Sequence, residues 1–230
     1  MSVDPESINT IQLPLFDFQK TSSYAFELFP KVWGAAEALI DGQFENRRAG
    51  LDCLEGLNAA RFSPLILYIV FSRMAEPDLN LRVRIIKILA NVLRPDENGQ
   101  YAPDSVRRVL IHHLSFLRMD EIFALLEAAE FDETTIPGIV SMFRENCMTG
   151  NDLTEIVMDR KMPIALRMQA ANFIARVGYV DAAPGLEKFI YRLESKVNGQ
   201  QLFTAYTPDA VDEGQLLPVL KDVLTVLKAP

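Results

Sequence analysis

The two histidines, His112 and His113, are the side chains best suited by type to catalysis or metal binding. An imidazole titrates near neutral pH and is the commonest metal ligand in proteins. These two are adjacent in a stretch with helical periodicity, so they point about 100° apart and cannot share a metal as histidines four positions apart do. No acid or cysteine stands at ligand spacing from them. We expect two ordinary helix residues, one of them half-buried.

The two cysteines, Cys53 and Cys147, lack the paired spacing of a disulfide framework or a zinc site. Cys53 falls at a position of a repeated pattern, described below, where other copies hold Ile88 and Phe173. It is therefore predicted to be a small core residue rather than a nucleophile. Cys147 lies near the end of a predicted helix and has no histidine close to it in the sequence.

Motifs of common enzyme classes are missing from the sequence. There is no glycine-rich phosphate loop, no Gly-x-Ser-x-Gly elbow and no paired-acid signature, and the 11 glycines are scattered. We therefore expect no catalytic, cofactor-binding or metal-binding residues, no cofactor, and a protein that is not an enzyme.

Acidic residues are concentrated in one stretch. Between Met119 and Phe143 there is no lysine or arginine, but there are six acids: Asp120, Glu121, Glu127, Glu130, Asp132 and Glu133. A charge run of this kind is usually a solvated helix face. The alternative is an acidic ridge that recognises a basic partner.

Composition narrows the class of partner. The 230 residues carry a net charge of -8, with a pI near 4.9, so a nucleic acid would be repelled. Hydrophobic residues make up 49% of the chain, which favours a face buried against another protein. The start of the chain does not resemble a signal peptide, and the longest uncharged apolar run, 62–72, is too short to span a bilayer. We expect a cytoplasmic protein without a membrane span.

Helices must position all of these residues, and the clearest pair lies at 166–193. Apolar residues at helical spacing fall on one face of each helix, Gly178 separates the two, and Pro184 opens the second. The apolar positions are Leu166, Ala170, Phe173, Ile174 and Val177, then Leu186, Phe189, Ile190 and Leu193. Such a pair cannot bury its apolar faces alone, so it must stack on neighbours.

The first helix of this pair belongs to a repeated pattern. An arginine is followed by apolar or small residues three, four, seven and ten positions later, and in two copies by a proline seventeen positions later. The arginines are Arg47, Arg82 and Arg167, and the prolines are Pro64 and Pro184. A fourth, degenerate copy begins at Glu121 and ends its apolar series at Phe131. Further helices are predicted at 32–40, 45–57, 103–117, 136–143, 153–158 and 216–227.

Helix pairs with this arginine and proline spacing resemble HEAT repeats, over about residues 31–197. In that family an aspartate six positions before the arginine pairs with it in a ladder along the stack. Asp41 with Arg47 fits this pattern and Glu76 with Arg82 is a variant, whereas Lys161 stands where the acid before Arg167 should be. The resemblance implies an all-α, right-handed α-solenoid of about four to five helix pairs.

The remaining segments frame this predicted HEAT-like solenoid, which we place at 23–197. Residues 1–22 are predicted to be an extended arm, in which Ile11, Leu13 and Leu15 alternate around Pro14. The arm either caps the end of the stack or docks onto another subunit, which would make an oligomer. Residues 198–214 are predicted to be a loop and 215–230 a C-terminal capping helix.

The function implied by the resemblance is a non-catalytic scaffold or adaptor that presents a curved helical surface to another protein. HEAT-like folds also occur in phycobilin lyases and in alkylpurine DNA glycosylases. The glycosylase alternative fits poorly, because this chain is acidic and has a single tryptophan, Trp33. Nothing in the sequence excludes a pigment-handling role. The predicted partner-binding residues are Asp52, Glu55, Lys87, Asn91, Glu127, Glu130, Glu133, Asn172 and Arg176.

Overall fold

The computed structural model describes residues 24–200 and 209–229 of the chain, with side chains at 29–195 and 214–229. Over these ranges the protein is all-α, with twelve α-helices, two short 3-10 helices and no strands. The predicted arm, 1–22, lies outside the described residues. The helices are α1 Tyr24–Leu39, α2 Phe44–Gly56, α3 Ala59–Phe62, α4 Pro64–Ser72, α5 Leu79–Leu93, α6 Asp104–Leu114, α7 Met119–Phe131, η1 Glu133–Thr135, α8 Ile136–Phe143, α9 Thr149–Met158, α10 Ile164–Val177, η2 Val180–Ala182, α11 Ala183–Gln200 and α12 Asp209–Lys228.

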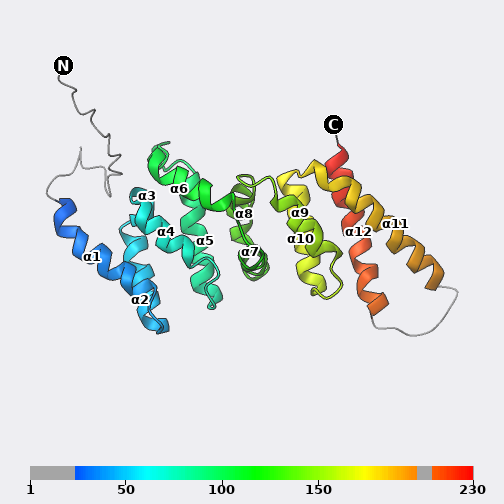
Figure 1. Ribbon diagram of the computed structural model, residues 1–230, viewed down its shortest axis with the longest axis horizontal. Coiled ribbons are helices and arrows are strands. Elements are labelled where there is room, and N and C mark those ends of the chain that lie inside the picture. Colours follow the sequence, from blue (N-terminus) through cyan, green and yellow to red (C-terminus); the bar gives the residue numbers. More distant parts are fainter. Residues whose placement is uncertain (1–23, 201–208, 230) are drawn as a thin grey trace, which may run out of the picture.

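The helices follow one another along the long axis of the molecule in two rows (Figure 1). In one row α2, α5, α7, α10 and α12 each contact the next. We call this the second-helix row, because each of its helices directly follows a helix of the other row in the chain. In the other row α1 contacts α4, α4 contacts α6, and α6 contacts α8, while α9 contacts α11 further along. The rows pack on each other through pairs such as α1–α2, α5–α8 and α9–α10.

Local signals explain several helix ends. Pro64 stands at the first turn of α4, where its missing N–H is harmless, and the Ser63 hydroxyl accepts a hydrogen bond from the backbone N–H of Ile66. Helix α5 is capped by the carboxylate of Asp78. Helix α10 ends at Gly178, whose φ of 87° is in the left-handed region that glycine adopts without strain.

The core lies between the two rows and contains most of the repeated apolar positions. The apolar positions after Arg82 and Arg167 are almost all fully buried, including the small residues Ala170 and Ala171. In the degenerate copy, Ala124, Leu125 and Ala128 are buried as the pattern predicts, whereas Phe131, at the last position, is 51% exposed. Phe131 is the final residue of α7, so its side chain lies at the edge of the core rather than within it.

Helices α1 and α2 approach more closely than side chains normally permit. A Cβ atom on Gly50 would lie 2.5 Å from the Ala35 carbonyl oxygen and 2.7 Å from the Leu39 nitrogen. The absence of a side chain at Gly50 therefore sets the spacing of this pair.

Both ends of the described chain differ from the predicted boundaries. Helix α1 begins at Tyr24 and continues through Pro30, which the sequence pattern placed before the helix. Residues 198–200 belong to α11 and residues 209–214 to α12, although the predicted loop covers 198–214; residues 201–208 lie outside the described ranges. Helix α12 buries Leu216, Leu220 and Val223 and contacts both α10 and α11.

Candidate interaction surface

Arg47, the first arginine of the repeated pattern, binds Glu76, the acid six residues before the second arginine, Arg82. The Arg47 guanidinium donates to Oε1 of Glu76 from Nε at 3.1 Å and from Nη2 at 2.8 Å. Its third nitrogen, Nη1, donates to the backbone oxygens of Gly42 and Asp41. The ion pair of Arg47 is therefore made to Glu76, 29 residues onward, while the Asp41 carboxylate accepts a turn hydrogen bond from the backbone N–H of Gln43.

Glu76 is a fully buried carboxylate held by two bases. Arg73 forms an ion pair with its second oxygen, Oε2. Burial alone would raise the pKa of Glu76, but the hydrogen bonds from Arg47 and Arg73 outweigh it and lower the pKa below its usual value. The carboxylate is thus ionised at neutral pH and joins the start of α2 to the turn before α5.

The other two arginines of the pattern, Arg82 and Arg167, also donate hydrogen bonds to the segment that precedes their own helix. Arg82 donates from Nε to the backbone oxygen of Glu76 at 2.7 Å, and from Nη1 to Glu127 of α7 at 2.6 Å. Arg167 donates from Nε to the backbone oxygen of Val157 at 2.9 Å. Asp159, the nearest acid before Arg167 in the sequence, accepts a hydrogen bond from the backbone N–H of Lys161.

Further ion pairs cross between helices of the second-helix row. Arg84 of α5 bridges Asp52 and Glu55 of α2, at 2.6 and 2.5 Å. Lys87 of α5 reaches Asp132, which follows α7, at 2.8 Å. Hydrogen bonds from Lys87 and then from Thr134 lower the pKa of Asp132 to about 2, so the Asp132 carboxylate is ionised at neutral pH.

The structure therefore brings together some of the predicted partner-binding residues and leaves others apart. Asp52, Glu55, Lys87 and Glu127 each take part in an ion pair that joins neighbouring segments along α2, α5 and α7. Glu130 and Glu133 are exposed, and neither has an ion pair among the described residues. Asn91, Asn172 and Arg176 take part in none of these ion pairs; Asn172 and Arg176 lie on α10, the next helix of the row.

Sequence reasoning missed two arginines. Arg84 holds two of the predicted residues, and Arg61, which is buried, donates to backbone oxygens of Asn91, Arg94 and Gln100. The only sequence signal for Arg84 was its position two residues after Arg82, on a helix that packs against α2 and its two acids. Nothing in the sequence marks Arg61, because its acceptors are backbone carbonyls.

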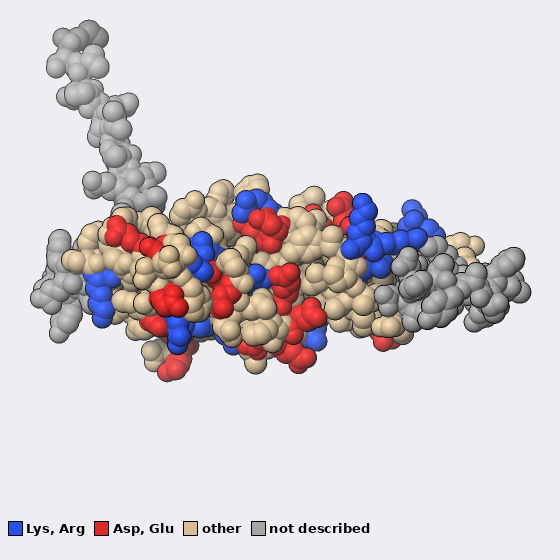
Figure 2. Space-filling view, turned by 90° about the horizontal axis from the view of Figure 1, so that it is seen from below, with Lys and Arg blue, Asp and Glu red and all other residues tan. Residues whose placement is uncertain are grey.

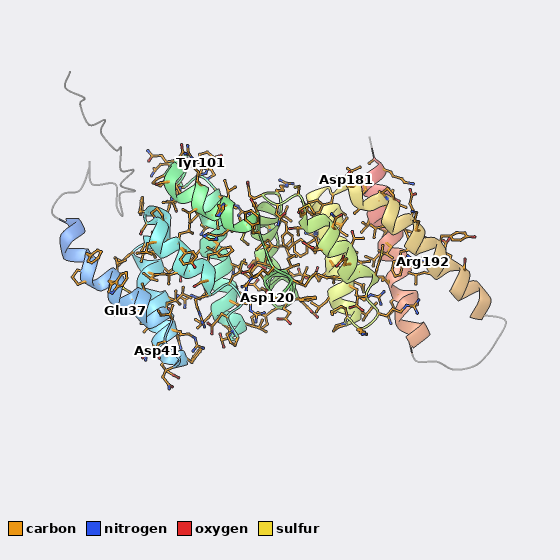
Figure 3. The ribbon with its side chains drawn as sticks, in the orientation of Figure 1. Glu37, Asp41, Tyr101, Asp120, Asp181 and Arg192 are labelled. Atoms are coloured by element: carbon orange, nitrogen blue, oxygen red, sulfur yellow. The ribbon has the colours of Figure 1, made fainter. Side chains whose placement is uncertain are left out.

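Charges on the lower face of the molecule are mixed rather than of one sign. Figure 2 shows acidic and basic side chains interspersed over much of this face, with a group of basic residues near one end. Asp41 and Asp120 lie toward the lower side of the molecule, whereas Tyr101 and Asp181 lie toward the upper side (Figure 3). A partner of this face would meet both signs of charge.

The histidines and cysteines take no part in these ion pairs. His113 is half-buried, with its ring 5.2 Å from that of Phe71 and 5.1 Å from that of Tyr68. Burial and the neighbouring His112 lower its pKa. Cys53 is half-buried against the core and Cys147 is exposed, and neither forms a disulfide. Within the described ranges, no three histidine, cysteine or acidic residues are grouped so that they could hold a metal ion.

Comparisons with known proteins complete this description. No protein-family model matches the chain, and no curated protein or solved structure is detectably similar to it. None of the helices in the described part of the chain is long and apolar enough to cross a membrane.

Proposed function

We propose that this chain is a HEAT-like α-solenoid that acts as a non-catalytic scaffold, binding a partner protein along the second-helix row. The observation that carries this proposal is the set of ion pairs that bridge α2, α5 and α7. These pairs hold adjacent helices in register, so that exposed side chains from separate repeats lie on one continuous surface.

The partner fitted by this surface is a protein with a partly basic face. Much of the surface charge is already neutralised within the chain, as in the Arg84 bridge to Asp52 and Glu55. Glu130 and Glu133 are exposed acids at the end of α7 without an ion pair among the described residues. They can therefore attract lysine or arginine on a partner without breaking a bond inside the scaffold.

The test uses the purified chain as bait for extracts of the source cells, with bound proteins identified by mass spectrometry. The surface variant is Glu130→Gln with Glu133→Gln. Glu127 is left intact, because it holds Arg82, whose side chain is only 9% exposed. The matched control is Glu97→Gln with Glu145→Gln, which removes the same charge at exposed positions outside α7.

We expect a partner that the wild type and the control retain and that the surface variant captures more weakly. With that partner purified, the association rate should fall with the surface variant and with rising salt, because steering by charge acts on the encounter. Equal binding by all three baits, or no specifically retained protein, would contradict the proposal. Circular dichroism checks that helix content is unchanged, as glutamine has nearly the helix propensity of glutamate.

A further inference from the structure

A small pocket of about 260 Å³ opens between the start of α7 and the end of α9. One wall is apolar and comes from both helices and from the turn before α10. Two carboxylates line the same pocket. The apolar lining residues are Met119, Phe123, Ile156 and Met162, and the acids are Glu155 and Asp159.

The two carboxylates are placed where negative charge is unfavourable without a cation. Glu155 lies in the last turns of α9 and Asp159 is the residue that directly follows the helix; because both line the same small pocket, their negative charges repel each other. They also stand at the C-terminus of α9, which is the negative end of the helix dipole. A positive group bound between them would offset both effects.

Neither acid is neutralised inside the described part of the chain. Glu155 has no hydrogen bond or ion pair to its carboxylate there, and Asp159 uses Oδ1 to accept the backbone N–H of Lys161 at 2.9 Å. Arg118, which directly precedes α7, is bound to Glu121 and Asp120, and it does not line the pocket.

The geometry points to a binding site for an arginine side chain of a partner protein. The volume is below the roughly 300–1,000 Å³ of typical small-molecule sites, so a single side chain is a better match than a cofactor or metabolite. This inference rests on the proposed scaffold function and identifies one feature of the partner. It goes beyond the second-helix row, because α9 belongs to the other row.

Arginine fits the apolar and the acidic lining residues in different ways. Its aliphatic stem packs on Met119 and Met162, whose flexible thioethers adapt to a guest. Its planar guanidinium stacks on the Phe123 ring and presents paired N–H donors to the carboxylates of Glu155 and Asp159. Lysine offers neither the planar stack nor the paired donors, so it should bind more weakly.

The experiment observes the methionine methyl groups of the full chain by NMR. The chain contains eight methionines, and the signals of Met119 and Met162 are assigned by single leucine replacements. The probe is a blocked pentapeptide, Ala-Leu-Arg-Leu-Ala, and the matched control peptide carries citrulline, a neutral isostere, in place of arginine. We expect the arginine peptide to shift Met119 and Met162 while the buried Met74 and Met142 stay in place.

A paired variant tests the carboxylates. Glu155→Gln with Asp159→Asn keeps the side-chain volumes, and the asparagine oxygen can still accept the Lys161 N–H. This variant should weaken peptide binding at least tenfold, whereas Glu97→Gln with Glu145→Gln, which removes equal charge elsewhere, should not. Equal binding of the citrulline peptide, equal binding by the paired variant, or no shift up to about 10 mM peptide would each overturn the inference.

Failure of this inference and failure of the proposed function give different results. If a partner is captured through Glu130 and Glu133 but the peptide does not bind, the pocket assignment is wrong and the scaffold function stands. If the peptide binds at Met119 and Met162 but no extract protein is retained, the pocket is real and the scaffold function fails.

Discussion

At Glu76, one buried carboxylate holds two arginines from different parts of the chain. Arg47 comes from the start of α2 and Arg73 from the end of α4, so the three charges connect the first helix pair to the second. Because the side chain of Glu76 is fully buried, water cannot take the place of the carboxylate between the two arginines if its charge is removed. The cluster therefore contributes mainly through the cost of breaking it.

Replacing Glu76 by glutamine should lower the free energy of unfolding by about 3–5 kcal/mol, since it leaves two guanidinium groups without their counter-charge. Urea unfolding followed by circular dichroism measures the change. The control is Glu55→Gln, which removes an exposed partner of Arg84 and should cost about 1 kcal/mol or less. Similar costs for the two variants would show that the Glu76 cluster is not the stronger link.

Wild type and Glu76→Gln should also differ in how their free energy of unfolding depends on acid pH. Hydrogen bonds hold the pKa of Glu76 in the folded chain below its ordinary 4.5. A depressed pKa contributes stability that is present above the unfolded value and is lost as the pH falls through the folded value. The difference between wild type and Glu76→Gln should therefore be constant above about pH 4.5 and should shrink below it. A difference that does not change with acidity would contradict the assignment.

At the scale of elements, helix packing depends on a glycine that the repeat pattern marks only as a small position. Gly50 lies against the backbone of α1 at Ala35 and Leu39. Gly34 is also inside a helix, but a Cβ atom there would meet nothing within 4 Å.

This contrast gives a matched pair of substitutions. Gly50→Ala should destabilise the protein by about 1–3 kcal/mol, because the new methyl group forces α1 and α2 apart. Gly34→Ala should stabilise it by about 0.5–1 kcal/mol, because alanine has the higher helix propensity and no contact is disturbed. Thermal melting of the two variants measures both effects. Two shifts of the same sign would mean that α1 and α2 are not packed as described.

Helix positions were more predictable from the sequence than helix contacts. The bounds of α8 match the predicted 136–143, because a proline at its first turn and short apolar spacing define it locally. The partner of Arg47 could not be predicted in this way. The family pattern favours Asp41 in the same turn, but the choice of Glu76 depends on how closely α2 and α5 approach, which no local pattern encodes.

The candidate surface was predictable in part for the same reason. Periodicity correctly placed exposed acids such as Asp52 and Glu55 on α2, outside the core. It could not predict that Arg84 neutralises both, because that pairing depends on the register between two helices. The pocket at α9 was not predicted at all, since its walls come from segments more than 30 residues apart.

On the scale of the whole molecule, contacts are local. Within the described part of the chain, two helices that pack against each other have at most two other α-helices between them in the sequence. Stability in such an arrangement depends on each helix pair and its neighbours, so the two ends can open independently.

Two leucine truncations test this independence. Leu220→Ala in α12 and Leu89→Ala in α5 each remove a fully buried side chain and should cost about 2–5 kcal/mol locally. Hydrogen exchange should accelerate over α10 to α12 in the first variant, leaving α2 and α5 protected. In the second variant the acceleration should centre on α5 and its neighbours. Uniform acceleration in both variants would show one cooperative unit instead.

Trp33 gives this arrangement an optical consequence. It is the chain's single tryptophan, it lies on α1, and its indole Nε1 donates to Glu37 at 2.7 Å. Its fluorescence therefore reports on the N-terminal end of the molecule alone, while far-ultraviolet circular dichroism averages over every helix. If the ends open independently, fluorescence and dichroism melting curves of the unmodified protein will separate, and a substitution in α12 will move the dichroism curve while leaving the fluorescence curve in place.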